Sequence, residues 1–123
     1  MSTSNAPVVV AVVEDDAPSR IALGRLLRAA GFEPALFDSA EAYLDASPAP
    51  MCIVLDVRLP GMSGIELQQR LRAADSAPPM IVTTSSHETV IQDRARQNGC
   101  AAFFRKPVDG NALTATIALL ANR

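Results

Sequence analysis

The chain has 123 residues, of which 49% are hydrophobic and 20% charged, with a formal net charge of −2. These values are typical of one globular domain with a single core and exclude an intrinsically disordered chain. The sequence contains no basic run, which argues against direct nucleic-acid binding by this segment. It also contains no apolar stretch long enough to span a membrane.

Residues 1–7 lack the basic start and apolar core of a secretory signal peptide. We expect them to form a flexible lead-in to one domain over residues 8–123, in a cytoplasmic protein. Cys52 and Cys100 lie in apolar stretches without a partner at metal-ligand spacing, so both are expected to be buried, reduced thiols.

Five short, mainly apolar runs predict strands at 8–13, 33–37, 53–56, 80–84 and 101–105, and the first, third and fourth of them are rich in β-branched residues. Pro34 in the second run indicates an edge strand, because proline cannot donate a hydrogen bond to a neighbouring strand. Acidic residues follow two of these runs directly: Glu14 and Asp15 after the first, and Asp56 at the end of the third.

Helical patterns separate the predicted strands. Pro18 opens a helix that Gly31 ends. The segment 38–41 has the spacing of a capping box with Asp38 as the cap, and it predicts a short helix through Leu44. Three further helices are expected at 63–73, at 87–98 and after the cap residue Asp109.

Five strands that alternate with five helices predict a doubly wound α/β fold, flavodoxin-like, with a parallel sheet in the order 2-1-3-4-5. This order places the first and third strands side by side. Glu14 and Asp15 should therefore lie next to Asp56, at the carboxyl edge where open α/β sheets bind their ligands.

Three converging carboxylates repel one another, at a cost on the order of 4 kcal/mol for two charges about 4 Å apart at an effective dielectric near 20. Each acid alone is most simply a solvated loop residue. Together with Lys106 and Thr84 at the ends of other strands, Glu14, Asp15 and Asp56 predict a site for a divalent cation. Hard oxygen ligands suit Mg²⁺ better than Zn²⁺.

From residue 8 to residue 120 the chain resembles the receiver domain of two-component response regulators, a CheY-like fold. The motifs that carry the resemblance are Glu14-Asp15, the loop 55–64 around Asp56, Thr84 and Lys106-Pro107. Arg58-Leu59-Pro60 and the segment 39–44 are similar to the FixJ-type branch of this family. The motifs occur in the family's order, each at a predicted strand end.

The resemblance implies that Asp56 accepts a phosphoryl group from a sensor histidine kinase or a phosphotransfer protein. Mg²⁺ would be held by Asp15, Asp56 and the backbone carbonyl of Arg58. Glu14 would act mostly through a metal-bound water. The family often has aspartate at the position of Glu14, so the ligand geometry is expected to differ there.

The resemblance also implies a switch. Lys106, before a cis Lys106-Pro107 bond, would pair with Asp56 and then with the phosphoryl group. Thr84 would turn toward that group and draw in the loop before the fourth helix. Phe103 matches the aromatic switch position, but Phe104 points to the opposite face of the strand and either ring could be the inward one. The surface of the fourth helix, fifth strand and fifth helix would then control a homodimer or an output partner.

Two other interpretations compete with this one. An aspartyl phosphatase similar to haloacid dehalogenases would carry an acid where this chain has Arg58. A phosphorylation-independent binding module would have a broken acidic pocket, yet every pocket residue is present. We therefore expect a phosphoacceptor that assists its own phosphorylation and dephosphorylation, and not a conventional enzyme. His87 is expected to be an exposed loop residue, not a metal ligand.

Overall fold

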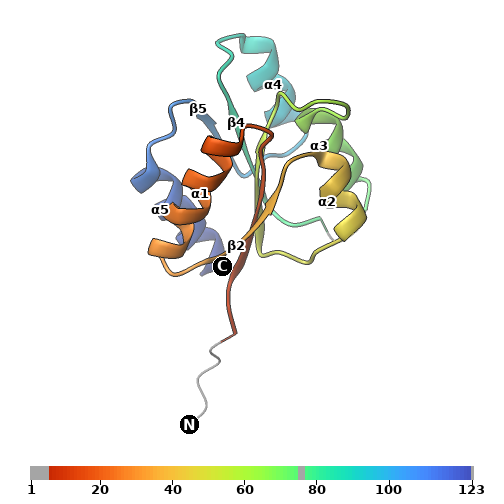
Figure 1. Cartoon of the computed structure of the whole chain (residues 1–123). Coiled ribbons are helices and arrows are strands. Elements are labelled where there is room, and N and C mark those ends of the chain that lie inside the picture. The colour runs from red at the N-terminus through yellow and green to blue at the C-terminus, as the bar shows by residue number, and fades with distance from the viewer. Residues whose placement is uncertain (1–5, 75–76, 123) are drawn as a thin grey trace.

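The structure is a computed structural model, and it describes residues 6–74 and 77–122. The strands are β1 (Val9–Val13), β2 (Glu33–Phe37), β3 (Cys52–Asp56), β4 (Met80–Thr84) and β5 (Ala102–Arg105). They form a parallel sheet in the order β2-β1-β3-β4-β5 (Figure 1). The predicted fold and strand order are confirmed, and Pro34 does lie in an edge strand. Most of the predicted lead-in, residues 1–5, falls outside the described residues.

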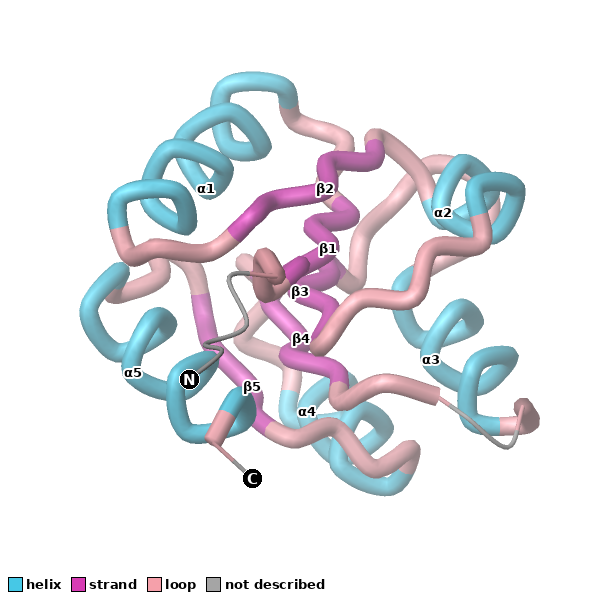
Figure 2. The backbone as a smooth tube through the Cα atoms, turned by 90° about the horizontal axis from the view of Figure 1, so that it is seen from below, coloured by secondary structure: helices cyan, strands magenta, loops and turns pink. Residues whose placement is uncertain are grey.

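The helices are α1 (Ala17–Ala29), α2 (Ala40–Ala46), α3 (Gly64–Arg72), α4 (Thr89–Gln97) and α5 (Gly110–Ala121). Figure 2 shows α1 and α5 on one face of the sheet and α2, α3 and α4 on the other. No helix in the described part of the chain is a candidate membrane span, since the longest has 13 residues.

The two faces of the sheet carry separate apolar clusters. Val13 and Leu55 pack toward α2, α3 and α4, whereas Val12 and Val54 pack toward α1 and α5. Helices cover both faces of the sheet, and this is why the strands are continuous apolar runs and not alternating apolar and polar ones. Cys52 is fully buried as predicted, and Cys100 is only half-buried; both thiols are free.

The predicted start of the second helix is wrong. Ser39, and not Asp38, caps α2, because its hydroxyl accepts a hydrogen bond from the Ala42 amide at 3.0 Å. Glu41 therefore does not close a capping box. Its carboxylate leaves the helix and accepts a hydrogen bond at 3.0 Å from the amide of Met62, in the loop between β3 and α3.

A capping box does form at the start of α3, the helix that follows β3 in the chain. The Ser63 hydroxyl accepts from the Glu66 amide at 3.1 Å, and the Glu66 carboxylate accepts from the Ser63 amide at 3.4 Å. The Gly64 amide donates to the carbonyl of Val57 at 2.9 Å. A Cβ atom at position 64 would overlap the carbonyl oxygen of Asp56, so only glycine allows this close approach.

We predict that Gly64→Ala lowers the free energy of unfolding by about 1–3 kcal/mol, because the backbone at Asp56 must move. Gly110→Ala is the matched control, since Gly110 also follows a helix cap. Its Cβ would meet only the end of the Leu26 side chain, at 3.1 Å. That side chain can move, so the control should change the free energy of unfolding by less than about 1 kcal/mol. Urea unfolding of both variants checks this, and equal losses would contradict it.

Candidate functional site

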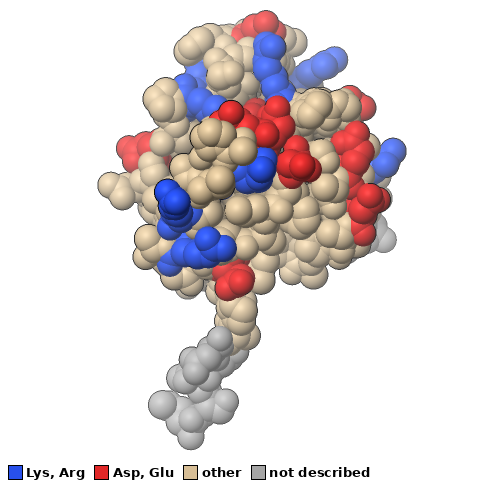
Figure 3. Space-filling model, viewed as in Figure 1, with Lys and Arg blue, Asp and Glu red and all other residues tan. Residues whose placement is uncertain are grey.

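Three carboxylates meet at the carboxyl edge of the sheet. Glu14 and Asp15 follow β1, Asp56 ends β3, and one carboxylate oxygen from each lies within 4.8 Å of the others. Glu14 and Asp56 are only 1% and 7% exposed, whereas Asp15 is exposed. Figure 3 shows one face of the molecule, with acidic side chains gathered in its upper part and basic side chains beside them. The adjacency of β1 and β3 brings the three acids together.

Lys106 is the cation that faces this cluster. It follows β5, its amide donates to the Thr84 carbonyl at 2.8 Å, and its peptide bond to Pro107 is cis. The ammonium group donates to an Asp56 oxygen at 2.8 Å and to a Glu14 oxygen at 2.5 Å. These are the ion pairs found among the described residues. With every group ionised, three carboxylates and one ammonium leave a formal charge of −2.

Burial and charge shift the ionisation of this group. Burial raises the pKa of Glu14, and the neighbouring charge of Asp56 raises it further, against the opposing effect of Lys106. Burial alone would lower the pKa of Lys106, but its hydrogen bonds to Asp56 and Glu14 outweigh this and raise it. The folded site therefore keeps Lys106 charged and resists the ionisation of Glu14.

The Asp56 carboxylate is held in one orientation. One of its oxygens accepts from Lys106, and the other accepts from the Arg58 amide at 3.1 Å. The donor set around it consists of oxygens only, with two negative charges in excess, which fits a hard divalent cation such as Mg²⁺. Glu14, Asp15, Asp56 and the Arg58 carbonyl are the residues that could hold such an ion.

Two side-chain hydroxyls accept hydrogen bonds along the segment that runs from this edge of the sheet to the start of α4. Thr84 is fully buried at the end of β4, and its hydroxyl accepts from the Ser86 amide at 3.0 Å. The Ser86 hydroxyl accepts in turn from the Glu88 amide at 3.1 Å, just before the helix. The position of Thr84 was predicted, but the part of Ser86 in this chain of hydrogen bonds was not.

The two phenylalanines of β5 lie on opposite faces, as the sequence indicated. Phe103 packs against the cluster under α2, α3 and α4, and Phe104 against the one under α1 and α5. Both rings are half-buried, so burial does not distinguish them. Phe103 lies on the side of α4. His87 is exposed and belongs to no cluster of potential metal ligands in the described ranges.

Sequence reasoning missed Arg20 of α1. Its guanidinium donates to the backbone carbonyls of Glu14 and Asp15, at 2.9 and 3.2 Å. Arg20 is placed by the start of its helix, where the Asp16 carboxylate accepts from the Ser19 amide. The spacing of Asp16 and Ser19 is a recognisable cap signal. No local pattern predicts that an arginine one turn later contacts carbonyls and not carboxylates.

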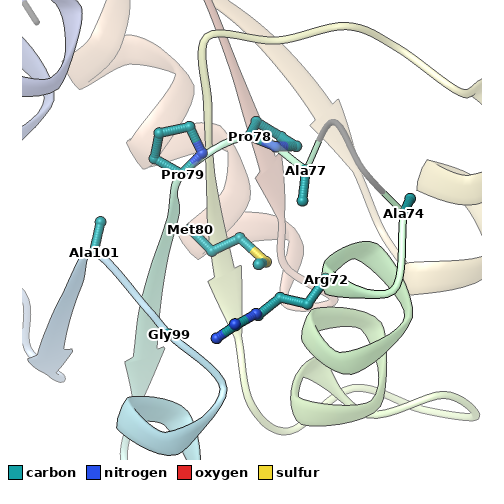
Figure 4. Close-up of a pocket in the computed structure, with 8 residues that line it drawn as sticks. All are labelled: Arg72, Ala74, Ala77, Pro78, Pro79, Met80, Gly99 and Ala101. Carbon is teal, nitrogen blue, oxygen red and sulfur yellow. The ribbon is translucent and has the colours of Figure 1, made fainter.

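A groove next to the acidic cluster lies on the side of α4. It has a volume of about 570 Å³ and is lined by Asp15, Val57, Arg58, Leu59, Pro60, Ser63, Ile65, Ile91 and Arg94. A second hollow, of about 430 Å³, lies at the other end of β4 (Figure 4). Arg72 reaches across it toward Gly99, and its lining contains no carboxylate. The groove beside Asp15 adjoins the acidic cluster, as does a hollow of about 320 Å³ whose lining includes Glu14 and Lys106, whereas the hollow at Arg72 does not.

Comparisons with known proteins agree with this geometry. The family model of the response regulator receiver domain matches residues 10–118. The chain is 42% identical over 108 residues to the transcriptional regulatory protein FixJ of Bradyrhizobium diazoefficiens, covering 86% of this chain and 53% of that protein. It is 37% identical over 113 residues to nodulation protein W of the same organism, covering 89% and 50%. The chain thus spans about half the length of these curated relatives.

A crystal structure of FixJ-N superposes on this chain with a TM-score of 0.85 and 29% sequence identity, and the superposition covers 96% of each chain.

The raised pKa of Glu14 predicts a pH dependence of stability without Mg²⁺. Because the folded-state pKa lies above the ordinary value of 4.5, the folded protein binds the proton more tightly than the unfolded chain. Stability is therefore lost as the pH rises from 4.5 through the raised pKa. Glu14→Gln, which cannot ionise, should gain stability relative to the parent over that window, measured by urea unfolding at a series of pH values. The control is Glu88→Gln, which removes an exposed carboxylate that does not belong to the acidic cluster. A constant difference between Glu14→Gln and the parent would contradict the prediction.

Proposed function

Because this chain belongs to the response regulator receiver domain family, we propose that it is a phosphorylation-dependent switch of two-component signalling, with Asp56 as the phosphoacceptor. The observation that carries this proposal is the orientation of Asp56. Its carboxylate is fixed by Lys106 and the Arg58 amide, beside two further acids and an open groove. A sensor histidine kinase or a phosphotransfer protein would supply the phosphoryl group.

In the proposed transfer, an Asp56 oxygen attacks the phosphorus atom of a phosphohistidine. The new O–P bond forms as the P–N bond breaks, and the imidazole nitrogen keeps the electron pair. Lys106 stays protonated, leaves the Asp56 carboxylate and pairs with a phosphoryl oxygen. The raised pKa of Lys106 supports this role, because the amine stays charged throughout. The product is an acyl phosphate on Asp56.

Asp15, Asp56 and the Arg58 carbonyl would hold Mg²⁺, with Glu14 acting mostly through a bound water. The excess of two negative charges among oxygen donors supports this assignment. The ion, when bound, neutralises phosphoryl oxygens as charge moves during transfer. The protein thereby assists its own phosphorylation and dephosphorylation, as a phosphoacceptor and not as a conventional enzyme.

Thr84 is the proposed link to the surface. Its hydroxyl would give up the Ser86 amide and donate to the phosphoryl group, which would draw the loop before α4 inward. Phe103 would then repack on the α4 side of β5. The surface formed by α4, β5 and α5 would change its affinity for a second copy of the chain or for an output partner, as a population shift between two states. The cytoplasmic location expected from the sequence stays a prediction.

We predict that Asp56→Asn abolishes phosphorylation while the fold is kept, because the amide nitrogen and oxygen replace the carboxylate at the same size. The measurement is intact mass after incubation with acetyl phosphate and Mg²⁺. The parent should gain a labile phosphoryl adduct and the variant none. An equal rate of incorporation in the variant would show that Asp56 is not the acceptor.

We also predict that Mg²⁺ stabilises the parent by mass action, because the unfolded chain has no assembled site. At a concentration about 100-fold above its dissociation constant, the ion should add about 2.7 kcal/mol. Asp15→Ala should lose most of this gain. Asp93→Ala, which removes an exposed acid of α4, is the matched control and should keep it. Melting temperatures with and without Mg²⁺ check this. A response of Asp15→Ala equal to that of the parent would count against the metal site.

A further inference from the structure

The contact between Glu41 and Met62 joins two segments that are 21 residues apart in the chain. Glu41 lies in the first turn of α2, and its carboxylate accepts from the Met62 amide at 3.0 Å. The same carboxylate lies against the backbone of Gly61, where an added Cβ atom would overlap it. Gly61 has a φ of +73°, a left-handed conformation that favours glycine. The loop is therefore shaped to receive this side chain.

Few other hydrogen bonds hold the backbone of the loop between β3 and α3. At its start the Arg58 amide donates to Asp56, and at its end the Gly64 amide donates to Val57. Between these points the described residues show two amides that donate hydrogen bonds: Ser63 donates to Glu66 of the following helix α3, and Met62 donates to Glu41 of the separate helix α2. Glu41 thus fixes the far side of the loop that carries the Arg58 carbonyl.

Glu41 is itself held in place. Ser39 caps α2, and the buried residues Ala40 and Tyr43 anchor the helix to the core. A carboxylate in the first turn is stabilised by the free amides of the helix N-terminus. The Met62 amide, together with the amide of Glu41 itself, lowers the pKa of Glu41, so the group stays charged at neutral pH. The contact is a charge-assisted hydrogen bond, about twice as strong as a neutral one.

We propose that Glu41 is a positioning residue for phosphoryl transfer. It holds the β3–α3 loop, which carries Arg58 and, through the Arg58 amide, contacts Asp56 of the acidic cluster. This inference rests on the proposed function, since it assigns Glu41 to the same metal and phosphoacceptor site. Glu41 touches neither the phosphoryl group nor the ion, and acts through the Met62 amide and the loop backbone.

The test compares Glu41→Ala, Glu41→Gln and the parent, with Asp45→Ala as the matched control. Asp45 is an exposed acid of the same helix, and its side chain makes no hydrogen bond within the described ranges. Three quantities are measured: the dissociation constant of Mg²⁺ by calorimetry, the rate of phosphorylation by acetyl phosphate, and the hydrogen exchange of the Met62 amide.

Glu41→Ala should weaken Mg²⁺ binding about 10-fold, the lower end of the effect of losing a supporting contact around a metal site. Phosphorylation at limiting Mg²⁺ should slow by a similar factor, and saturating Mg²⁺ should restore most of the rate. The Met62 amide should exchange faster. Glu41→Gln keeps an oxygen acceptor without the charge, so it should fall between Glu41→Ala and the parent. Asp45→Ala should match the parent.

A purely structural role would give a different result. Glu41→Ala would then lose stability in Mg²⁺-free urea unfolding, with an unchanged dissociation constant and rate, and this outcome overturns the proposal. Unchanged exchange of the Met62 amide overturns it as well. If Glu41→Ala does not fold, Glu41→Gln decides by the same measurements. A parent that neither binds Mg²⁺ nor accepts a phosphoryl group refutes the proposed function itself.

Discussion

The burial of Glu14 and Asp56 against a single lysine is the interaction on which the rest of the structure depends. Two carboxylates at 1% and 7% exposure repel each other, and Lys106 compensates only one of them. Removing such groups from water opposes folding. The sheet supplies the opposing free energy, because β1, β3 and β4 are covered on both faces by two apolar clusters. The strand order then fixes which acids and which lysine meet.

Apart from the ion pairs of Lys106, hydrogen bonds that involve backbone amides and carbonyls hold the acidic cluster in position. Arg58 donates its amide to Asp56, and Arg20 contacts the carbonyls of Glu14 and Asp15 without neutralising their side chains. Gly64 lets α3 begin directly against the backbone of Asp56. The acids are thus oriented without cancellation of their charge.

The fold and the acidic cluster could be predicted from the sequence because both depend on local signals. β-branched runs mark strands covered on both faces, and parallel strands end at a shared edge, so Glu14, Asp56 and Lys106 had to lie at that edge. The side-chain partners followed no such rule. Asp38 and Ser39 are both good helix caps, and only the tertiary structure selects Ser39. With Ser39 as the cap, the Glu41 side chain does not close a capping box and instead accepts a hydrogen bond from the loop at Met62, 21 residues away in the chain. The local spacing of residues cannot predict this contact.

The charge imbalance that opposes folding is also what makes a switch possible. A phosphoryl group on Asp56 would carry about two negative charges in place of the single charge of the carboxylate, and would so make a site with a formal charge of −2, with every group ionised, still more negative. Lys106 is already shared between Glu14 and Asp56, so the added charge must recruit new donors. Thr84 ends β4 at that edge, and its hydroxyl accepts from a backbone amide, that of Ser86. In the proposed switch, moving Thr84 would break a hydrogen bond at the start of the segment that leads into α4, and this would couple the electrostatics at Asp56 to the position of a helix on the surface.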